Sequence, residues 1–232
     1  MKKPSVIIIM GAPGSGKGTQ AELVSDKFNS YYLETSKIIE AHVMQAGEKD
    51  YETVGGKKYP LAKERELWRG GILNTPEVVA SWVKNKIKEL SREGRGVVFA
   101  GSPRTLYEGK EVIPLLKKLY GTKNIKVILL EISPEQTIWR NSNRRLCELM
   151  RHPILSTGKE FLSLTHCPLD GSELVRRKGL DDPETIKVRL KEYKERTLPL
   201  VKYFKEQGLN VKKINGEQSV EAVHKDILKA II

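Results

Sequence analysis

The chain has 232 residues, and its 41 Lys and Arg against 29 Asp and Glu give a formal net charge of +12. Apolar residues make up 39% and charged residues 30%, the composition of an ordinary globular protein. No apolar run approaches the roughly 20 residues that a membrane helix needs, and two cysteines are too few for a disulfide framework. The positive charge favours anionic ligands, whereas 6% aromatic residues offer little for stacking on nucleic-acid bases.

Short apolar runs alternate with charged stretches of helical pattern, which predicts a parallel sheet covered by helices. The chain starts with two lysines and an apolar run, as a signal peptide does, but this run is too short and a glycine-rich loop follows at once. We therefore expect no export and a cytoplasmic location. In the first part of the chain we expect a strand at 5–10, a helix at 17–28, a strand at 31–33, a helix at 36–46, a polar loop at 48–62 and a helix at 77–90. In the middle we expect a strand at 96–99, a Lys-rich helix at 110–123, a strand at 125–132, a helix at 135–143 and an irregular insertion at 147–178. The last part should contain a helix at 182–204 that Pro199 kinks or interrupts, a strand at 211–214 and a closing helix at 219–231.

Residues 11–19, Gly-Ala-Pro-Gly-Ser-Gly-Lys-Gly-Thr, follow the first strand and open the first helix. This is the context of a phosphate loop, in which glycines let backbone N–H groups wrap a phosphate at a helix N-terminus. Lys17 would reach the β and γ phosphates, and the Thr19 hydroxyl would hold Mg²⁺. The residues expected to bind the triphosphate are Gly14, Ser15, Gly16, Lys17, Gly18 and Thr19.

Further motifs follow in a fixed order. They are Gly-Ser-Pro-Arg-Thr at 101–105, three arginines within 140–145, Asp-Asp-Pro-Glu-Thr at 181–185 with Arg189, and Asn-Gly-Glu-Gln at 215–218. Together with the G-x-P-G-x-G-K-G-T form of the phosphate loop, they resemble the adenylate kinase family of nucleoside monophosphate kinases. The resemblance implies one kinase domain over 1–232 with a five-stranded parallel sheet. It also implies a monophosphate-binding segment at about 36–76 and a lid at about 141–178.

The resemblance assigns roles to the arginines. Arg104 and Arg189 would grip the acceptor phosphate and the reacting centre, while Arg140 and Arg144 would close over ATP from the lid. Arginine suits this task because phosphoryl transfer spreads negative charge that a permanent, planar cation neutralises. One of Arg176 and Arg177 would join them, and Arg177 is the candidate retained. Gln218 would lie in the loop that contacts the ATP base.

On the acceptor side some residues match the family pattern. Thr35 and Leu73 match the acceptor-base pocket, Asn74 lies beside them, and Gly101 opens the motif that contains Arg104. Others depart from it. Ala100 replaces an Asp that helps to order Mg²⁺ and its waters, Ser102 replaces an aromatic residue, Glu40 replaces an arginine for the acceptor phosphate, and Glu108 replaces a glutamine that reads adenine.

These departures carry two hypotheses. Glu40 would repel the acceptor phosphate, and we expect a cation of the 51–69 segment to compensate. The candidates are Lys57, Lys58, Lys63 and Arg65. Glu108 only accepts hydrogen bonds, which suits guanine's N1–H and N2–H₂ better than adenine. The base preference is therefore broadened or shifted toward guanine, or else Glu108 has turned away from the base.

The lid of many relatives holds zinc with four cysteines or three cysteines and an aspartate. Cys147, Cys167 and Asp170 fit three of these positions, but the fourth is Met150, a poor zinc ligand. His152 or His166 could substitute for it. The interpretation preferred over a structural zinc is two semi-buried thiols in a degenerate site.

The sequence thus favours an enzyme that transfers the γ-phosphoryl group of Mg·ATP to AMP, with ATP and a nucleoside monophosphate as partners. The alternatives are the same fold with broadened or guanine-leaning specificity, and a weakly active nucleotide-binding protein that lacks the Mg²⁺-ordering Asp. A nucleic-acid binder rests on charge alone, since no nucleic-acid motif is present, and we expect neither nucleic acid nor a membrane as a partner. The sequence predicts no oligomeric state.

Overall fold

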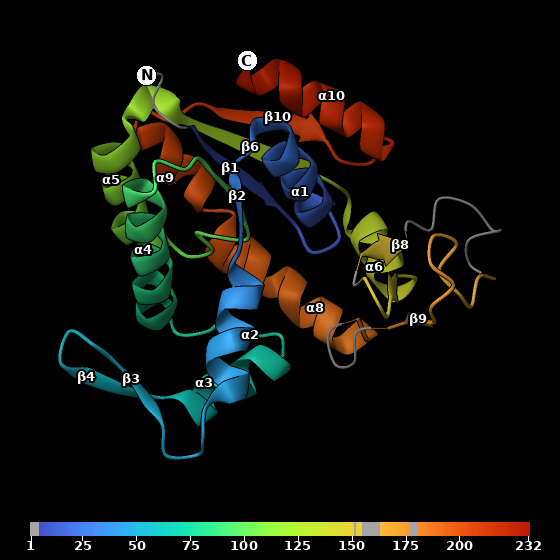
Figure 1. The fold of residues 1–232 in the computed structure, drawn as a ribbon, viewed down its shortest axis with the longest axis horizontal. Coiled ribbons are helices and arrows are strands. Elements are labelled where there is room, and N and C mark those ends of the chain that lie inside the picture. The colour runs from blue at the N-terminus through green and yellow to red at the C-terminus, as the bar shows by residue number, and fades with distance from the viewer. Residues whose placement is uncertain (1–4, 151, 155–162, 177–180) are drawn as a thin grey trace.

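The computed structural model describes residues 5–150, 152–154, 163–176 and 181–232. A five-stranded parallel sheet forms the centre of the molecule, in the order β10-β6-β1-β5-β2 (Figure 1). This confirms the predicted sheet and all five predicted strands to within one or two residues. The strands are β1 (Val6–Gly11), β2 (Tyr31–Glu34), β5 (Val97–Ala100), β6 (Ile125–Glu131) and β10 (Val211–Asn215).

Helices cover both faces of the sheet (Figure 1). Because side chains alternate along a strand, Ile7 and Ile9 of β1 pack on one face and Val6 and Ile8 on the other. The first face packs against α1 (Lys17–Phe28) and α10 (Val220–Ile231). The second packs against α4 (Pro76–Arg92), α5 (Leu106–Tyr120) and α9 (Leu200–Glu206). The mostly apolar strands therefore lie in the core, between the two helical layers.

Helix α4 shows how the pattern of the sequence specifies the packing. Pro76 occupies the first turn, where its missing N–H costs nothing. Six apolar side chains that recur at helical spacing are all buried against the sheet and α5, as predicted. They are Val78, Val79, Trp82, Val83, Ile87 and Leu90.

The segment between β2 and α4 projects away from the sheet (Figure 1). It contains α2 (Thr35–Gln45), an antiparallel hairpin of β3 (Tyr51–Val54) and β4 (Lys57–Pro60), and α3 (Leu61–Arg69). The prediction of a loop at 48–62 is therefore wrong. Gly55 and Gly56 both have positive φ, 58° and 80°, which is the requirement of the tight turn that joins two antiparallel strands.

A short 3₁₀ turn (Thr122–Asn124) leads into β6, and a second projecting segment follows that strand. It begins with α6 (Pro134–Ser142) and continues into a small antiparallel sheet of order β8-β7-β9. Its strands are β7 (Arg145–Cys147), β8 (Pro153–Ile154) and β9 (Leu174–Val175). The predicted insertion at 147–178 thus has short strands in the part that the structure describes.

The chain returns to the sheet through α8 (Pro183–Glu192), which Asp182 caps by accepting a hydrogen bond from Thr185 N at 3.0 Å. A π-helical turn, Tyr193–Thr197, separates α8 from α9. The predicted interruption of the helix near Pro199 is therefore confirmed. It begins earlier than expected, at Tyr193, and ends where α9 begins at Leu200. Among the described residues, no helix combines the length and apolarity needed to cross a bilayer.

Candidate active site

A cavity of about 1500 Å³ opens at the carboxyl ends of the sheet strands. Parallel α/β sheets bind ligands at this edge. The cavity is lined from four directions: by the loop after β1, by the start of α2 and residues 71–74, by the loop after β5, and by α6, β7, β8 and α8. Residues far apart in the sequence therefore face one space.

Residues 11–19 form the floor of this cavity. Gly14 and Gly16 have positive φ, 80° and 84°, and Gly16 is the N-cap of α1 with no side-chain cap. The first N–H groups of α1 are consequently left for an anion. The Ser15 hydroxyl is buried and has no hydrogen-bond partner among the residues that the structure describes, and Lys17 donates to the carbonyl of Ala12 at 3.1 Å. A loop with an orphaned hydroxyl and a lysine folded onto its own backbone fits a phosphate.

Arg104 reaches the cavity from the loop after β5. Its backbone N–H donates to the Glu108 carboxylate at 2.9 Å, its guanidinium donates to Gly101 O, and its own carbonyl accepts from the Thr197 hydroxyl at 2.8 Å. Burial lowers the pKa of Arg104, and the nearby charges of Glu108 and Glu34 oppose that effect. Arg104 is thus held at three points before any substrate arrives.

Arg140, Arg144 and Arg189 line the same cavity. Arg140 of α6 approaches Gly14 O at 3.5 Å, and Arg144 lies 3.8 Å from the buried Asp181 carboxylate. Arg189 comes from α8, where its side chain packs over Gly71. Arg177 lies outside the described residues, whereas Arg176 is described and lines the cavity.

The remaining residues expected to bind ATP also lie here. The cavity lining includes Gly14, Ser15, Gly16, Lys17, Gly18, Thr19 and Gln218. Gln218 donates to Asn215 O at 3.0 Å in the loop after β10. The structure therefore brings together in one cavity those residues expected to bind ATP, the phosphate donor, that it describes.

On the acceptor side the placement is mixed. Glu40, Leu73, Asn74 and Gly101 line the cavity, while Thr35 is buried behind it. Glu108 does not line it. Its carboxylate accepts from Arg104 N and from the Thr105 hydroxyl at 3.1 Å, and its N–H donates to Thr105 Oγ1 at 3.2 Å. This reciprocal pattern caps the start of α5, and burial raises the pKa of Glu108.

None of the four cations expected to offset Glu40 lines the cavity. Arg65 instead holds α3 to the end of α2, where it donates to Val43 O at 2.8 Å and to Ala46 O and pairs with Glu48 at 2.9 Å. Lys57 and Lys58 lie over tyrosine rings of the hairpin, and Lys63 is exposed on α3. Between residues 35 and 75, the cation that lines the cavity is Lys37, which the sequence analysis missed although it lies two residues after Thr35.

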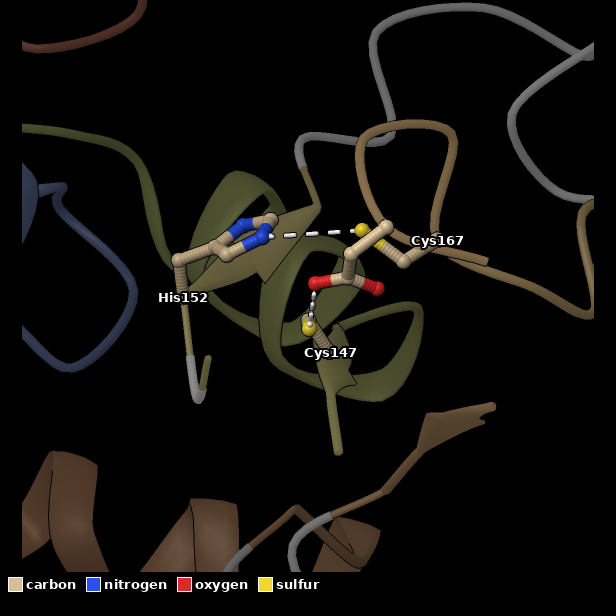
Figure 2. Close-up of side chains that lie close together, drawn as sticks. Cys147, His152 and Cys167 are labelled. Carbon is tan, nitrogen blue, oxygen red and sulfur yellow. Dashed lines mark hydrogen bonds between the residues drawn. The ribbon is translucent and has the colours of Figure 1, made fainter. Parts of the chain in front are cut away.

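A second cluster lies in the small sheet beyond α6. Figure 2 shows Cys147, His152 and Cys167 converging, and with Asp170 their ligand atoms all lie within 4.8 Å of one another. The Cys147 thiol donates to Asp170 at 3.0 Å, and Cys167 Sγ lies 3.6 Å from His152 Nε2. Hydrogen bonding from the Cys147 thiol lowers the pKa of Asp170, and burial raises that of Cys167.

The expected gap at Met150 is therefore filled by His152, which directly precedes β8, the strand paired with β7. His166, the other candidate, instead bonds to the hydroxyl of Thr165 at 2.9 Å. Two thiols, an imidazole and a carboxylate are a donor set that suits Zn²⁺.

Comparison with known proteins agrees with the interpretation of the cavity as a nucleotide-binding site. The model of a family described as adenylate kinase matches residues 9–209. A protein named adenylate kinase from Caldicellulosiruptor saccharolyticus is 32% identical over 97% of this chain and 98% of its own length. Proteins of the same name from Caldicellulosiruptor bescii and Methanothrix thermoacetophila are 33% and 32% identical, each over 97% of this chain, with 98% and 97% of their own lengths covered.

Proposed function

This chain belongs to the adenylate kinase family, and from that premise we propose that it transfers the γ-phosphoryl group of Mg·ATP reversibly to AMP, giving two molecules of ADP. Membership of this family makes the chain a phosphotransferase of the nucleoside monophosphate kinase class, with the P-loop α/β fold. The observation that carries the proposal is the convergence of Lys17, Arg104, Arg140, Arg144 and Arg189 on one cavity from four separate elements.

The chemistry explains why cations converge there. The transferred group spreads its charge over three oxygens, so that catalysis is mostly positioning and charge neutralisation. Lys17 and the N–H groups of the phosphate loop would hold the donor phosphates, and Arg140 and Arg144 would approach them from α6 and its end. Arg104 and Arg189 would hold the acceptor phosphate in line, since both line the cavity and Arg189 packs over Gly71.

Mg²⁺ would accompany ATP in this proposal and would neutralise part of the charge on its phosphates. The cavity fits such an ion because oxygen donors lie beside the loop. The Thr19 hydroxyl is the donor assigned to hold it, and Thr19 lines the cavity two residues after Lys17.

The two projecting segments would bind the substrates. We propose residues 36–76 as the monophosphate-binding segment and residues 141–178 as a lid that excludes water, because water would otherwise accept the phosphoryl group. For the second segment we also propose a structural Zn²⁺ held by Cys147, His152, Cys167 and Asp170, supported by their convergence (Figure 2). The proposed location is the cytoplasm.

AMP is preferred over GMP as the acceptor because the reason to expect a shift toward guanine was the Glu108 carboxylate. That carboxylate is used in capping α5 and does not line the cavity. A protein that only binds nucleotides would have little use for arginines on both sides of the phosphate loop, which counts against the weakly active alternative.

The test is to incubate the purified protein with Mg·ATP and each of AMP, GMP, CMP, UMP and dTMP, and to separate the products by chromatography. We expect rapid ADP formation with AMP, little diphosphate from the others, and loss of transfer in Lys17→Ala. Comparable turnover of several acceptors would contradict the AMP assignment. Tight ATP binding without any transfer would contradict the kinase assignment for this chain.

A further inference from the structure

The strand beside the phosphate loop lacks a carboxylate at its end. In P-loop proteins generally, Mg²⁺ is held by the hydroxyl that follows the loop's lysine together with a strand-end Asp. Here β5 lies next to β1, with Ala100 in register with Ile9, and β5 ends in the methyl side chain of Ala100. On the other side of β1, β6 ends in Glu131, which pairs with Lys213 at 2.7 Å outside the phosphate cavity.

A carboxylate stands one strand further along the same edge of the sheet. Glu34 is the last residue of β2, and the parallel pairing of β2 with β5 places Glu34 directly opposite Ala100. Both residues line the phosphate cavity. A glutamate has one methylene more than an aspartate, which extends its reach back across the neighbouring strand.

The Glu34 carboxylate lies among side chains of β2 and of the first turn of α2, and one of them, Tyr32, reaches the start of α1. The Tyr32 hydroxyl interacts with the charge of Glu34, and a Cβ built on Gly18 would lie 3.3 Å from that hydroxyl. Ser36 donates its hydroxyl to Glu34 Oε1 at 2.9 Å, and the Lys37 ammonium lies 3.4 Å from Oε2. The carboxylate is therefore anchored beside the loop residue that precedes Thr19.

Two other carboxylates of the cavity have hydrogen-bond partners of their own, while Glu40 lies on α2 and Glu148 follows β7, so neither of these stands at the end of a strand of the central sheet. Glu192 accepts from Leu73 N at 3.1 Å and from Arg196 at 2.8 Å, and Glu217 accepts from Ser133 N at 2.7 Å. Glu22 also lines the cavity, but it lies on α1 nearly one turn beyond Thr19 and not at a strand end. Its equal charge makes it a matched control.

We propose that Glu34 supplies, from β2, the carboxylate that β5 lacks, and that it orients the water shell of the Mg²⁺ bound with the nucleotide. This inference rests on the proposed use of Mg·ATP. A carboxylate in this role accepts hydrogen bonds from metal-bound water, and the loss of such outer partners commonly weakens metal binding about 10- to 100-fold.

The experiment measures Mn²⁺, a paramagnetic substitute for Mg²⁺, by the electron paramagnetic resonance signal of the free ion. It uses the full chain with a non-hydrolysable ATP analogue. The variants are Glu34→Gln, Glu22→Gln, and Glu34→Gln combined with Ala100→Asp. We expect Glu34→Gln to weaken Mn²⁺ binding in the nucleotide complex about tenfold or more. Glu22→Gln should have a much smaller effect, and the double variant should recover most of the affinity because residue 100 faces residue 34.

A purely structural role of Glu34 predicts something else. In that case Glu34→Gln would weaken the binding of the analogue in the presence of a chelator and would lower the unfolding temperature. Adding Ala100→Asp would restore neither the binding nor the unfolding temperature. We expect metal-free analogue binding by Glu34→Gln to be unchanged or tighter, since a negative charge has left the cavity. Glu34→Ala serves as a second variant and should weaken Mn²⁺ binding to a similar extent.

Equal Mn²⁺ affinity in wild type, Glu34→Gln and Glu34→Ala would overturn the inference and leave the proposed function intact. So would an equal loss in Glu34→Gln and Glu22→Gln, which would mark a general charge effect. A wild-type protein that binds the analogue with no Mn²⁺ in the complex would instead remove the proposed use of Mg·ATP, on which the inference depends.

Discussion

Asn74 donates its side-chain amide to Glu64 twice, to the backbone carbonyl at 2.7 Å and to the carboxylate at 2.9 Å. The same carboxylate accepts from the backbone N–H of Thr75 at 2.9 Å and from its hydroxyl. Glu64 is 1% exposed, so these donors compensate the cost of burying its charge. The contacts tie α3 to the start of α4, on either side of residues 71–74 that line the cavity.

Asn74→Ala should therefore weaken both the fold and acceptor binding. Removing a donor from a buried carboxylate costs about 1–3 kcal/mol, so we expect a loss of this size in urea unfolding. The KM for AMP should rise while the KM for ATP stays the same, because residues 71–74 move and the phosphate loop does not. Gln45→Ala, at an exposed site of α2, is the control and should change neither quantity. A parallel rise in both KM values would contradict this account.

Glu108 provides a test of capping against base recognition. Glu108→Gln keeps an acceptor for Arg104 N and removes a buried charge, so we expect little change in stability and an unchanged ratio of AMP to GMP turnover. Glu108→Ala keeps the Thr105 cap of α5 but removes the acceptor of the Arg104 N–H and of the Thr105 hydroxyl, and should lower the free energy of unfolding by about 1–3 kcal/mol. A change of acceptor preference in Glu108→Gln, with normal stability, would place this side chain at the base.

Lys37 is the cation that we expect to offset Glu40 at the acceptor phosphate. Its side chain is 74% exposed and lines the cavity from the first turn of α2, where the ammonium lies 3.4 Å from Glu34 Oε2. Lys37→Gln should raise the KM for AMP up to about fivefold, which corresponds to the roughly 1 kcal/mol that an exposed ion pair contributes. The effect should shrink at high salt. Lys57→Gln and Lys58→Gln, on the hairpin, are the matched controls. An equal effect of these two variants would restore the hairpin lysines as the compensating cations.

The donor side of the site was predictable because its signals are local. The phosphate loop combines a glycine-rich run, a lysine and a threonine between one strand and one helix, and the apolar stripe of α4 needs only a helical period. The β3–β4 hairpin was missed because its residues are polar and exposed, so that Gly55-Gly56 looked like part of a loop rather than a turn between strands.

Three other features depend on how the folded chain places side chains and strands, which the sequence pattern did not display. Glu108 occupies a position that suggested base reading, but its environment is set by Arg104 and Thr105. The pairing of Glu34 with Ala100 follows from the strand order, in which β2 lies beside β5. His152 joins Cys167 because a short turn reverses the chain after β7.

Zinc removal should affect the lid more than the sheet. We expect about one zinc per chain by elemental analysis, and a strong chelator should release it and lower the temperature of the first unfolding transition, because binding to a folded site stabilises that fold. His152→Ala should lose the metal, whereas His166→Ala, whose imidazole bonds to Thr165, should keep it. Equal zinc content in the two variants would contradict the role of His152. Absence of zinc in wild type, even after purification with added zinc, would support the degenerate thiol pair.

The stability of the protein should fall between pH 7 and pH 5, with His42 as one cause. Its ring stacks on Trp82 of α4, with centroids 4.1 Å apart and planes at 3°. Burial lowers the pKa of His42, an effect that the charge of Glu52 partly offsets. The unfolded chain therefore binds a proton at His42 before the folded chain does, and stability is lost as the pH falls from the ordinary value of 6.5 toward the lowered one.

His42→Phe keeps an aromatic partner for Trp82 and removes the proton. Urea midpoints measured from pH 8 to pH 5 should fall less steeply in this variant than in wild type. Part of the slope should remain, because burial, aided by the charge of Lys27, also lowers the pKa of His224, and the same sign argument applies to it. His224→Phe is the matched control and should remove a separate part of the pH dependence of the urea midpoint. Identical slopes in wild type and His42→Phe would show that protonation of His42 does not disturb the contact between α2 and α4.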